Sequence, residues 1–88
     1  MNKIKLSKKV FFKKIKDKYI IIKVGEKFIR QLNETGNLIF DLVIKKKRFK
    51  DIVKKIVNIY EIDIKQAEND VFLFIKKYLK EGIFEEEK

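Results

Sequence analysis

Three short runs of apolar residues occupy the first third of the chain, and polar residues bound each of them. Residues 10–12, 19–24 and 27–32 are rich in β-branched and aromatic side chains, which favours β-strands. Asp17 and Lys18 separate the first two runs as a turn does, and Gly25 and Glu26 separate the second from the third. Because the connections are short, the pattern predicts a three-stranded antiparallel meander.

The rest of the chain has helical periodicity and predicts three helices. Asn33 is a good N-cap for the first helix, with Glu34 in its first turn. The clearest amphipathic stripe lies within residues 49–60 and predicts the second helix. Residues 63–66 resemble a capping box and open a third helix, which Gly82 ends. Ile83 and Phe84 are expected to pack back onto that helix.

The predicted order is therefore three strands followed by three helices, an α+β domain similar to a winged helix-turn-helix. A chain of 88 residues is short enough for one hydrophobic core. We expect residues 1–88 to form a single domain, with its core at about residues 8–84. Apolar residues make up 45% of the chain, which argues against disorder.

The composition favours a binding module over an enzyme. The chain contains neither Cys nor His, so disulfides, thiolate zinc sites, Cys nucleophiles and the usual general base are excluded. Four carboxylates, Glu61, Asp63, Glu68 and Asp70, surround a helix start, where the helix dipole favours acids. We interpret Asp63 as a helix cap, and we expect no catalytic residues, no metal and no cofactor.

The charge is distributed unevenly. The 23 Lys and Arg outnumber the 13 Asp and Glu, for a net charge of +10; residues 1–60 carry +13 and residues 61–88 carry −3. Only Arg30 and Arg48 are arginines, and Arg is the better reader of bases and phosphates. No run approaches the roughly 18–20 apolar residues of a membrane span, and no signal-peptide core follows the basic N-terminus. We expect a cytoplasmic protein without membrane association or specific nucleic-acid binding.

The third helix has more apolar surface than one core face requires. Phe72 and Leu79 lie together on one flank, next to Ile75 and beside Lys76, while Leu73 lies nearly opposite the core. This flank is either buried by a domain that wraps the helix deeply or forms one wall of a groove for a partner. The third strand raises a similar question, because an edge strand is either protected or used for pairing.

Several segments together resemble the PqqD family of RiPP recognition elements, where RiPP denotes a ribosomally synthesised and post-translationally modified peptide. The likeness lies in the sequence LNETG at residues 32–36, in residues 51–53, 60–63 and 67–71, and in residues 74–75 and 82–83. It covers about residues 8–84. Two features depart from the family: the basic segment 45–48 replaces the usual Gly and Ser/Thr, and Arg30 replaces an apolar residue.

The resemblance implies a domain that binds the leader segment of a precursor peptide and presents it to a modifying enzyme, such as a radical-SAM maturase or a leader peptidase and cyclase. In the family the leader adds an antiparallel strand to the third strand, against the third helix. The matching positions on the strand are Lys27, Phe28, Ile29, Arg30 and Gln31, and those on the helix are Phe72, Ile75, Lys76 and Leu79. Asn33 and Gly36 are interpreted as structural, Asn33 as a cap and Gly36 as the point where the first helix approaches the sheet.

Two other functions stay open at this point. One is a DNA-binding winged helix with a basic patch formed by Lys45, Lys46, Lys47, Arg48, Lys50, Lys54 and Lys55. The other is an oligomerisation module that uses Leu73 and the free strand edge, although we expect a monomer or a weak dimer. The acidic residues 85–87 are interpreted as a solvated tail.

Overall fold

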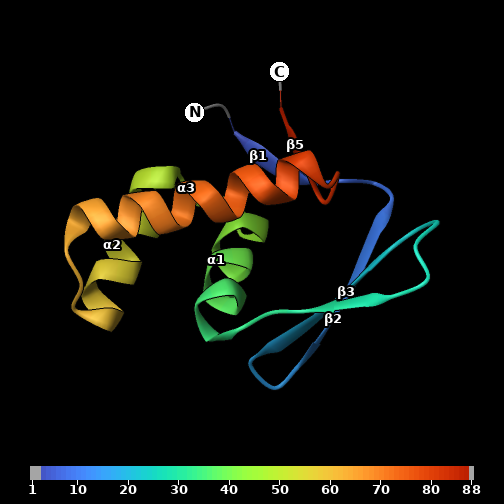
Figure 1. Cartoon of the computed structure of the whole chain (residues 1–88), viewed down its shortest axis with the longest axis horizontal. Helices are drawn as coiled ribbons and strands as arrows, with labels where there is room; N and C mark the ends of the chain where they lie inside the picture. Colours follow the sequence, from blue (N-terminus) through green and yellow to red (C-terminus); the bar gives the residue numbers. More distant parts are fainter. Residues whose placement is uncertain (1–2, 88) are drawn as a thin grey trace.

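The computed structural model describes residues 3–87, which form five strands and three helices (Figure 1). The strands are β1 (Ile4–Leu6), β2 (Val10–Ile15), β3 (Lys18–Lys23), β4 (Ile29–Gln31) and β5 (Phe84–Glu86). The helices are α1 (Glu34–Ile44), α2 (Phe49–Tyr60) and α3 (Ile64–Lys80). The predicted meander corresponds to β2, β3 and β4, and the three predicted helices are α1, α2 and α3. The α+β fold class is therefore confirmed.

The sheet β2-β3-β4 is antiparallel, with β3 in the centre. In its register Phe11 lies opposite Ile22, and Ile22 lies opposite Ile29. Side chains alternate between the two faces of a strand, so these three residues point to one face while Tyr19, Ile21 and the other inward residues point to the opposite face. The strand β4 is only three residues long, shorter than the run at residues 27–32 suggested.

A second, two-stranded sheet joins the two ends of the described chain. Its strands β1 and β5 are antiparallel, with Leu6 opposite Phe84 and Ile4 opposite Glu86. The amide of Glu87 continues this pairing by donating to the carbonyl of Lys3 at 2.8 Å. The interpretation of residues 85–87 as a solvated tail is therefore wrong for their backbone. Strand pairing also extends beyond residues 8–84, the range expected for the core. A three-residue strand carries too little periodicity to be recognised in a sequence.

The hydrophobic core lies between the inner face of β2-β3-β4, the three helices and β5. Phe40 of α1 is at its centre, with ring centroids 4.9 Å from Tyr19 of β3 and 5.8 Å from Phe84 of β5. Ile21, Phe40 and Ile83 have no exposed surface. As predicted, Ile83 and Phe84 pack back under α3.

Two polar side chains of α1 tie the helix to the sheet. The side-chain oxygen of Asn37 accepts from the amide of Tyr19 at 2.7 Å, and the Tyr19 hydroxyl donates to Asp41 at 2.5 Å. The Asn37 amide group in turn donates to the carbonyls of Leu32 and Asn33, both at 3.0 Å. Because Asn37 is buried and its polar atoms are satisfied, it fixes where β3 and the end of β4 lie on α1.

The helix ends follow the sequence. Asn33 caps α1 by accepting from the amide of Gly36 at 2.7 Å, and Asp63 caps α3 by accepting from the amide of Lys65 at 3.1 Å. Gly82 follows α3 with a φ of 75°, a left-handed conformation that favours glycine. A Cβ at Gly36 would lie 3.2 Å from the ring of Phe74 and 3.4 Å from Cβ of Leu32, which follows β4, so this glycine permits the close approach of α1 to α3 as well as to the end of β4.

No helix within residues 3–87 combines the length and the apolar character needed to cross a lipid bilayer.

Candidate functional site

The strand β4 is an edge of the three-stranded sheet. One of its edges pairs with β3, and within residues 3–87 no strand pairs with the other. Such an edge exposes backbone amide and carbonyl groups that accept an added strand. This side of β4 is therefore open within residues 3–87, and pairing of a peptide strand with residues 27–31 stays a prediction.

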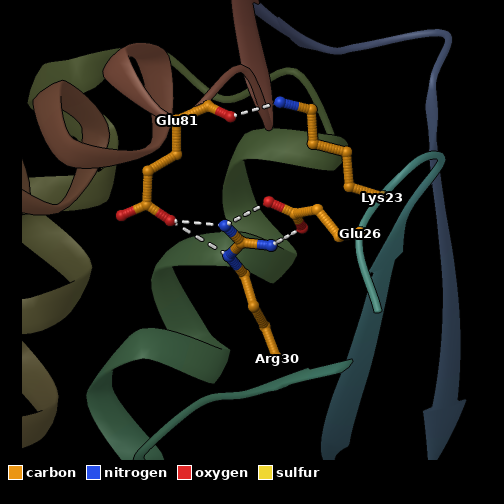
Figure 2. A network of polar contacts seen from close by, with 4 residues as sticks. All are labelled: Lys23, Glu26, Arg30 and Glu81. Carbon is orange, nitrogen blue, oxygen red and sulfur yellow. Dashed lines mark hydrogen bonds and ion pairs between the residues drawn. The ribbon is translucent and has the colours of Figure 1, made fainter. Parts of the chain in front are cut away.

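Arg30 connects β4 to the C-terminal end of α3 (Figure 2). Its side chain points to the inner face of the sheet, where Nε and Nη2 donate to one carboxylate oxygen of Glu81 at 3.0 and 2.7 Å. The same guanidinium forms a two-armed contact with the carboxylate of Glu26, in the loop between β3 and β4. Lys23 adds a bond from Nζ to the Glu81 carbonyl at 2.7 Å. These four residues are called the Arg30 network below.

The electrostatics of the Arg30 network follow from its pairing. The hydrogen bond from Arg30 lowers the pKa of Glu26 below its ordinary value, and the two carboxylates raise the pKa of Arg30. The Arg30 side chain is only 13% exposed, so its charge is held by these partners more than by water. A two-armed contact between a guanidinium and a carboxylate also fixes orientation. The network therefore sets the position of β4 relative to the end of α3.

Phe74 and Tyr78 lie on the same side of α3 as Glu81, the C-cap residue that contacts Arg30. Tyr78 is close enough to Arg30 and Glu81 for both charges to affect its pKa, which burial raises to about 12. The ring of Phe74 lies 4.4 Å from that of Tyr78 and against Gly36, at the start of α1. Phe74, Tyr78 and Glu81 are called the helix wall below; Tyr78 is 4% exposed and belongs to the core, whereas Phe74 and Glu81 are half-buried.

The predicted strand residues lie at or just before this edge, on different faces. Lys27 and Phe28 precede β4; Phe28 is 56% exposed, and the Arg30 guanidinium lies 4.9 Å from its ring centroid. Ile29 and Gln31 alternate with Arg30 and therefore point to the outer face of the sheet, where both are exposed. The structure thus places all five residues in one segment, in which Arg30 contacts Glu81 at the end of α3 and Phe28 lies against Arg30.

The predicted helix residues do not meet the strand. Ile75 is 1% exposed and belongs to the core, so its side chain lines no open groove. Phe72, Lys76 and Leu79 lie about 140–180° around α3 from Glu81, at 100° per residue, and so face away from Arg30 and β4. Phe72 contacts Lys76 instead, with Nζ 5.8 Å from the ring centroid. Peptide contact at these positions stays a prediction, and the fold gives it no support.

Helical spacing places Phe74 and Tyr78 on the core face of the third helix, and the structure confirms this, since Tyr78 is buried in the core and Phe74 packs against it. Sequence reasoning did not single out Glu81, which contacts Arg30 of β4. A helical wheel shows which residues share a face, but it cannot show which border of the apolar face lies beside the sheet. A sequence signal was present in the charges: Arg30 replaces an apolar residue of the family, and a buried guanidinium requires carboxylate partners.

The basic segment between α1 and α2 is partly neutralised. Lys45 pairs with Asp41 at 2.8 Å and Lys46 pairs with Glu87 at 2.9 Å. Arg48 stands at the start of α2 and, among the described residues, makes no side-chain capping bond there. These pairings reduce the charge available for phosphates, and they do not favour the DNA-binding alternative.

Comparison with protein families supplies the identification. Residues 18–83, three quarters of the chain, match the family model of PqqD, the coenzyme PQQ synthesis protein D. The chain belongs to the PqqD family. The matched range of this PqqD-family protein begins with β3 and ends after α3, so it includes both β4 and the helix wall. A search of curated proteins finds no match.

Two solved structures are similar to the PqqD-family chain over nearly its whole length. One is TbiB1 in complex with the TbiA(beta) leader peptide, with 24% identity and a TM-score of 0.85, covering 96% of this chain and 98% of the other. The second is lasso peptide synthetase B1 complexed with the leader peptide, with 17% identity and a TM-score of 0.85, covering 94% and 98%. At these identities the likeness shows a shared fold.

Proposed function

We propose that this PqqD-family chain binds the leader segment of a ribosomally made precursor peptide and presents it to a modifying enzyme. The observation that carries the proposal is the free edge of β4 beside α3. Family membership and the two similar leader-peptide complexes support it. The chain does no chemistry in this role; the peptide is held for an enzyme that acts on it.

In the proposed complex the leader adds an antiparallel strand to residues 29–31. Backbone hydrogen bonds supply much of the affinity, and side chains that point to alternate faces supply specificity. Leader side chains on the inner face meet the half-buried side chains of Phe74 and Glu81 in the helix wall. Side chains on the outer face continue the row of Ile29 and Gln31. The basic N-terminal body attracts an acidic leader and speeds association.

The test is an NMR titration of the labelled protein with the cognate leader. We expect the largest amide shifts at residues 28–31, at residues 74–80 of α3 and at Glu81, with new hydrogen-exchange protection in β4. A matched pair of variants localises the peptide. Ile29→Pro removes a backbone donor from the edge strand. The control Leu73→Ser changes an exposed residue remote from β4. Shifts confined to residues 45–55 would exclude the proposed site.

A further inference from the structure

The strand β3 has a sequence suited to two covered faces. Tyr19, Ile20, Ile21 and Ile22 form an uninterrupted apolar run, which is typical of strands buried on both sides. The fold covers only one of them: Tyr19 and Ile21 are 4% and 0% exposed, while Ile22 is 44% exposed. In an antiparallel sheet with one solvated face, alternation of apolar and polar residues is expected instead.

The uncovered face carries an apolar row that crosses all three strands. Phe11, Ile22 and Ile29 are paired in register and are 62%, 44% and 50% exposed; they are called the outer stripe. Directly opposed side chains have Cβ atoms about 4.5–5.5 Å apart, so the outer stripe is continuous. Ile15, on the same face, is 47% exposed. Contiguous apolar surface of this kind marks an interaction site.

The charges on this face indicate what covers it. The outward positions of β2, β3 and β4 include Lys13 and Lys18 but no acidic residue. A second copy of the chain would bring these lysines together and would add to a net charge of +10 on each molecule. A surface that is apolar at its centre and carries carboxylates around it is complementary.

The outer stripe is also continuous with the proposed peptide site. Ile29 belongs to the stripe, and the free edge of the same strand is where the leader would add. A leader strand on β4 would extend the outer face by one strand, about 4.8 Å. A protein that covers the outer stripe would therefore touch the presented peptide as well.

We propose that the outer stripe is the docking surface for the modifying enzyme that receives the peptide, through an apolar patch flanked by carboxylates. This inference rests on the proposed function and adds a second surface to it. The leader then uses the free edge of β4, and the enzyme uses the outer face of the sheet. The enzyme binds the outer face of β4, while the inner face of β4 contacts the Arg30 network at the end of α3.

The experiment measures affinity for two probes separately: the leader peptide, and the purified enzyme encoded beside the precursor peptide gene. In the variant Phe11→Ser/Ile22→Ser we expect enzyme affinity to fall at least tenfold while leader affinity changes less than twofold. The charge variant Lys13→Glu/Lys18→Glu tests the same surface without altering its apolar residues, and we expect a similar loss. Binding of the unaltered protein should weaken as salt is raised.

Matched controls lie on exposed positions of the helices. Leu73→Ser changes a residue that is 52% exposed on α3, and Lys54→Glu reverses an exposed charge on α2. Both should leave enzyme affinity unchanged. Equal losses in controls and stripe variants, or no loss in the stripe variants, would overturn the docking surface.

Three further outcomes separate the alternatives. Absence of leader binding by the unaltered protein contradicts the proposed function, whereas leader binding without enzyme binding contradicts only the docking surface. Binding to vesicles of phosphatidylglycerol and phosphatidylcholine that the stripe variants abolish would assign the face to a lipid surface and overturn the proposal. Dimerisation in sedimentation experiments that the same variants abolish would assign it to a second copy and overturn it too.

Discussion

The two faces of β2-β3-β4 are built from the same apolar residue types but serve different ends. On the inner face Tyr19 and Ile21 are buried against Phe40, and Asn37 and Asp41 satisfy the polar groups nearby. On the outer face the residues of the outer stripe remain 44–62% exposed. The difference shows that apolar content alone does not identify a core, because burial depends on which elements the chain places over each face.

The largest expected effect separates neighbouring residues of β3. Ile21→Ala should lower the free energy of unfolding by about 2–5 kcal/mol, because it leaves a cavity in the core. Ile22→Ala should change it by no more than about 0.5 kcal/mol, as is usual for exposed positions. Urea unfolding of the two variants measures both values. Equal losses would mean that the outer face is covered within the monomer.

The next largest effect on stability should come from the polar side chains that fix α1 to the inner face of the sheet. Asn37→Ala leaves the amide of Tyr19 and the carbonyl of Leu32 without their partner, and burying an unpaired group costs about 1–3 kcal/mol. Asn58→Ala, at an exposed position of α2, is the matched control and should have little effect. A stability loss no larger than that of the control would show that water replaces Asn37.

The inward-pointing and outward-pointing residues of β4 should differ less in their contribution to stability. Arg30→Ala removes the Arg30 network and should cost about 1–2 kcal/mol, a low value because the carboxylate partners are partly exposed. Gln31→Ala, which points outward, should cost little. Leader affinity should fall in Arg30→Ala as well, because β4 loses its fixed position beside α3. Unfolding and leader titrations on both variants check this, and identical behaviour would contradict the role of the network.

The smallest expected effect is the dependence of stability on acid pH. Burial alone would raise the pKa of Asp41, but hydrogen bonds from Lys45 and Tyr19 lower it below the ordinary 3.8. Its contribution is therefore present above about pH 4 and is lost as pH falls through the lowered value. The stability difference between the unaltered protein and Asp41→Asn should shrink in that range. A difference that stays constant on acidification would contradict the assignment.

Much of the fold was readable from local signals. The runs at residues 10–12 and 19–24 became β2 and β3, and the caps at Asn33 and Asp63 and the stop at Gly82 lie where predicted. These features depend on residues near one another in sequence. The pair β1-β5 was not readable, because it joins segments about 80 residues apart and each strand has three residues.

The candidate site divides in the same way. The edge strand at residues 27–31 followed from the order of the meander and from the resemblance to the PqqD family. The helix wall did not, because helical spacing puts Phe74 and Tyr78 on the core face, and only the packing of α3 brings Glu81, which follows on that side, to Arg30 of β4. Ile75 illustrates the limit, since the resemblance assigned it to the peptide site, whereas the structure buries it in the core, where helical spacing also put it.

The sequence by itself determined the order of elements, the ends of the helices and the absence of Cys and His chemistry, since these depend on composition and on neighbouring residues. Only the tertiary structure decided which side of α3 faces β4, that Arg30 meets Glu26 and Glu81, and that one apolar face of the sheet remains uncovered. The physical reason is that these features depend on the rotation of a helix about its axis and on contacts between distant segments. Neither is specified by local periodicity.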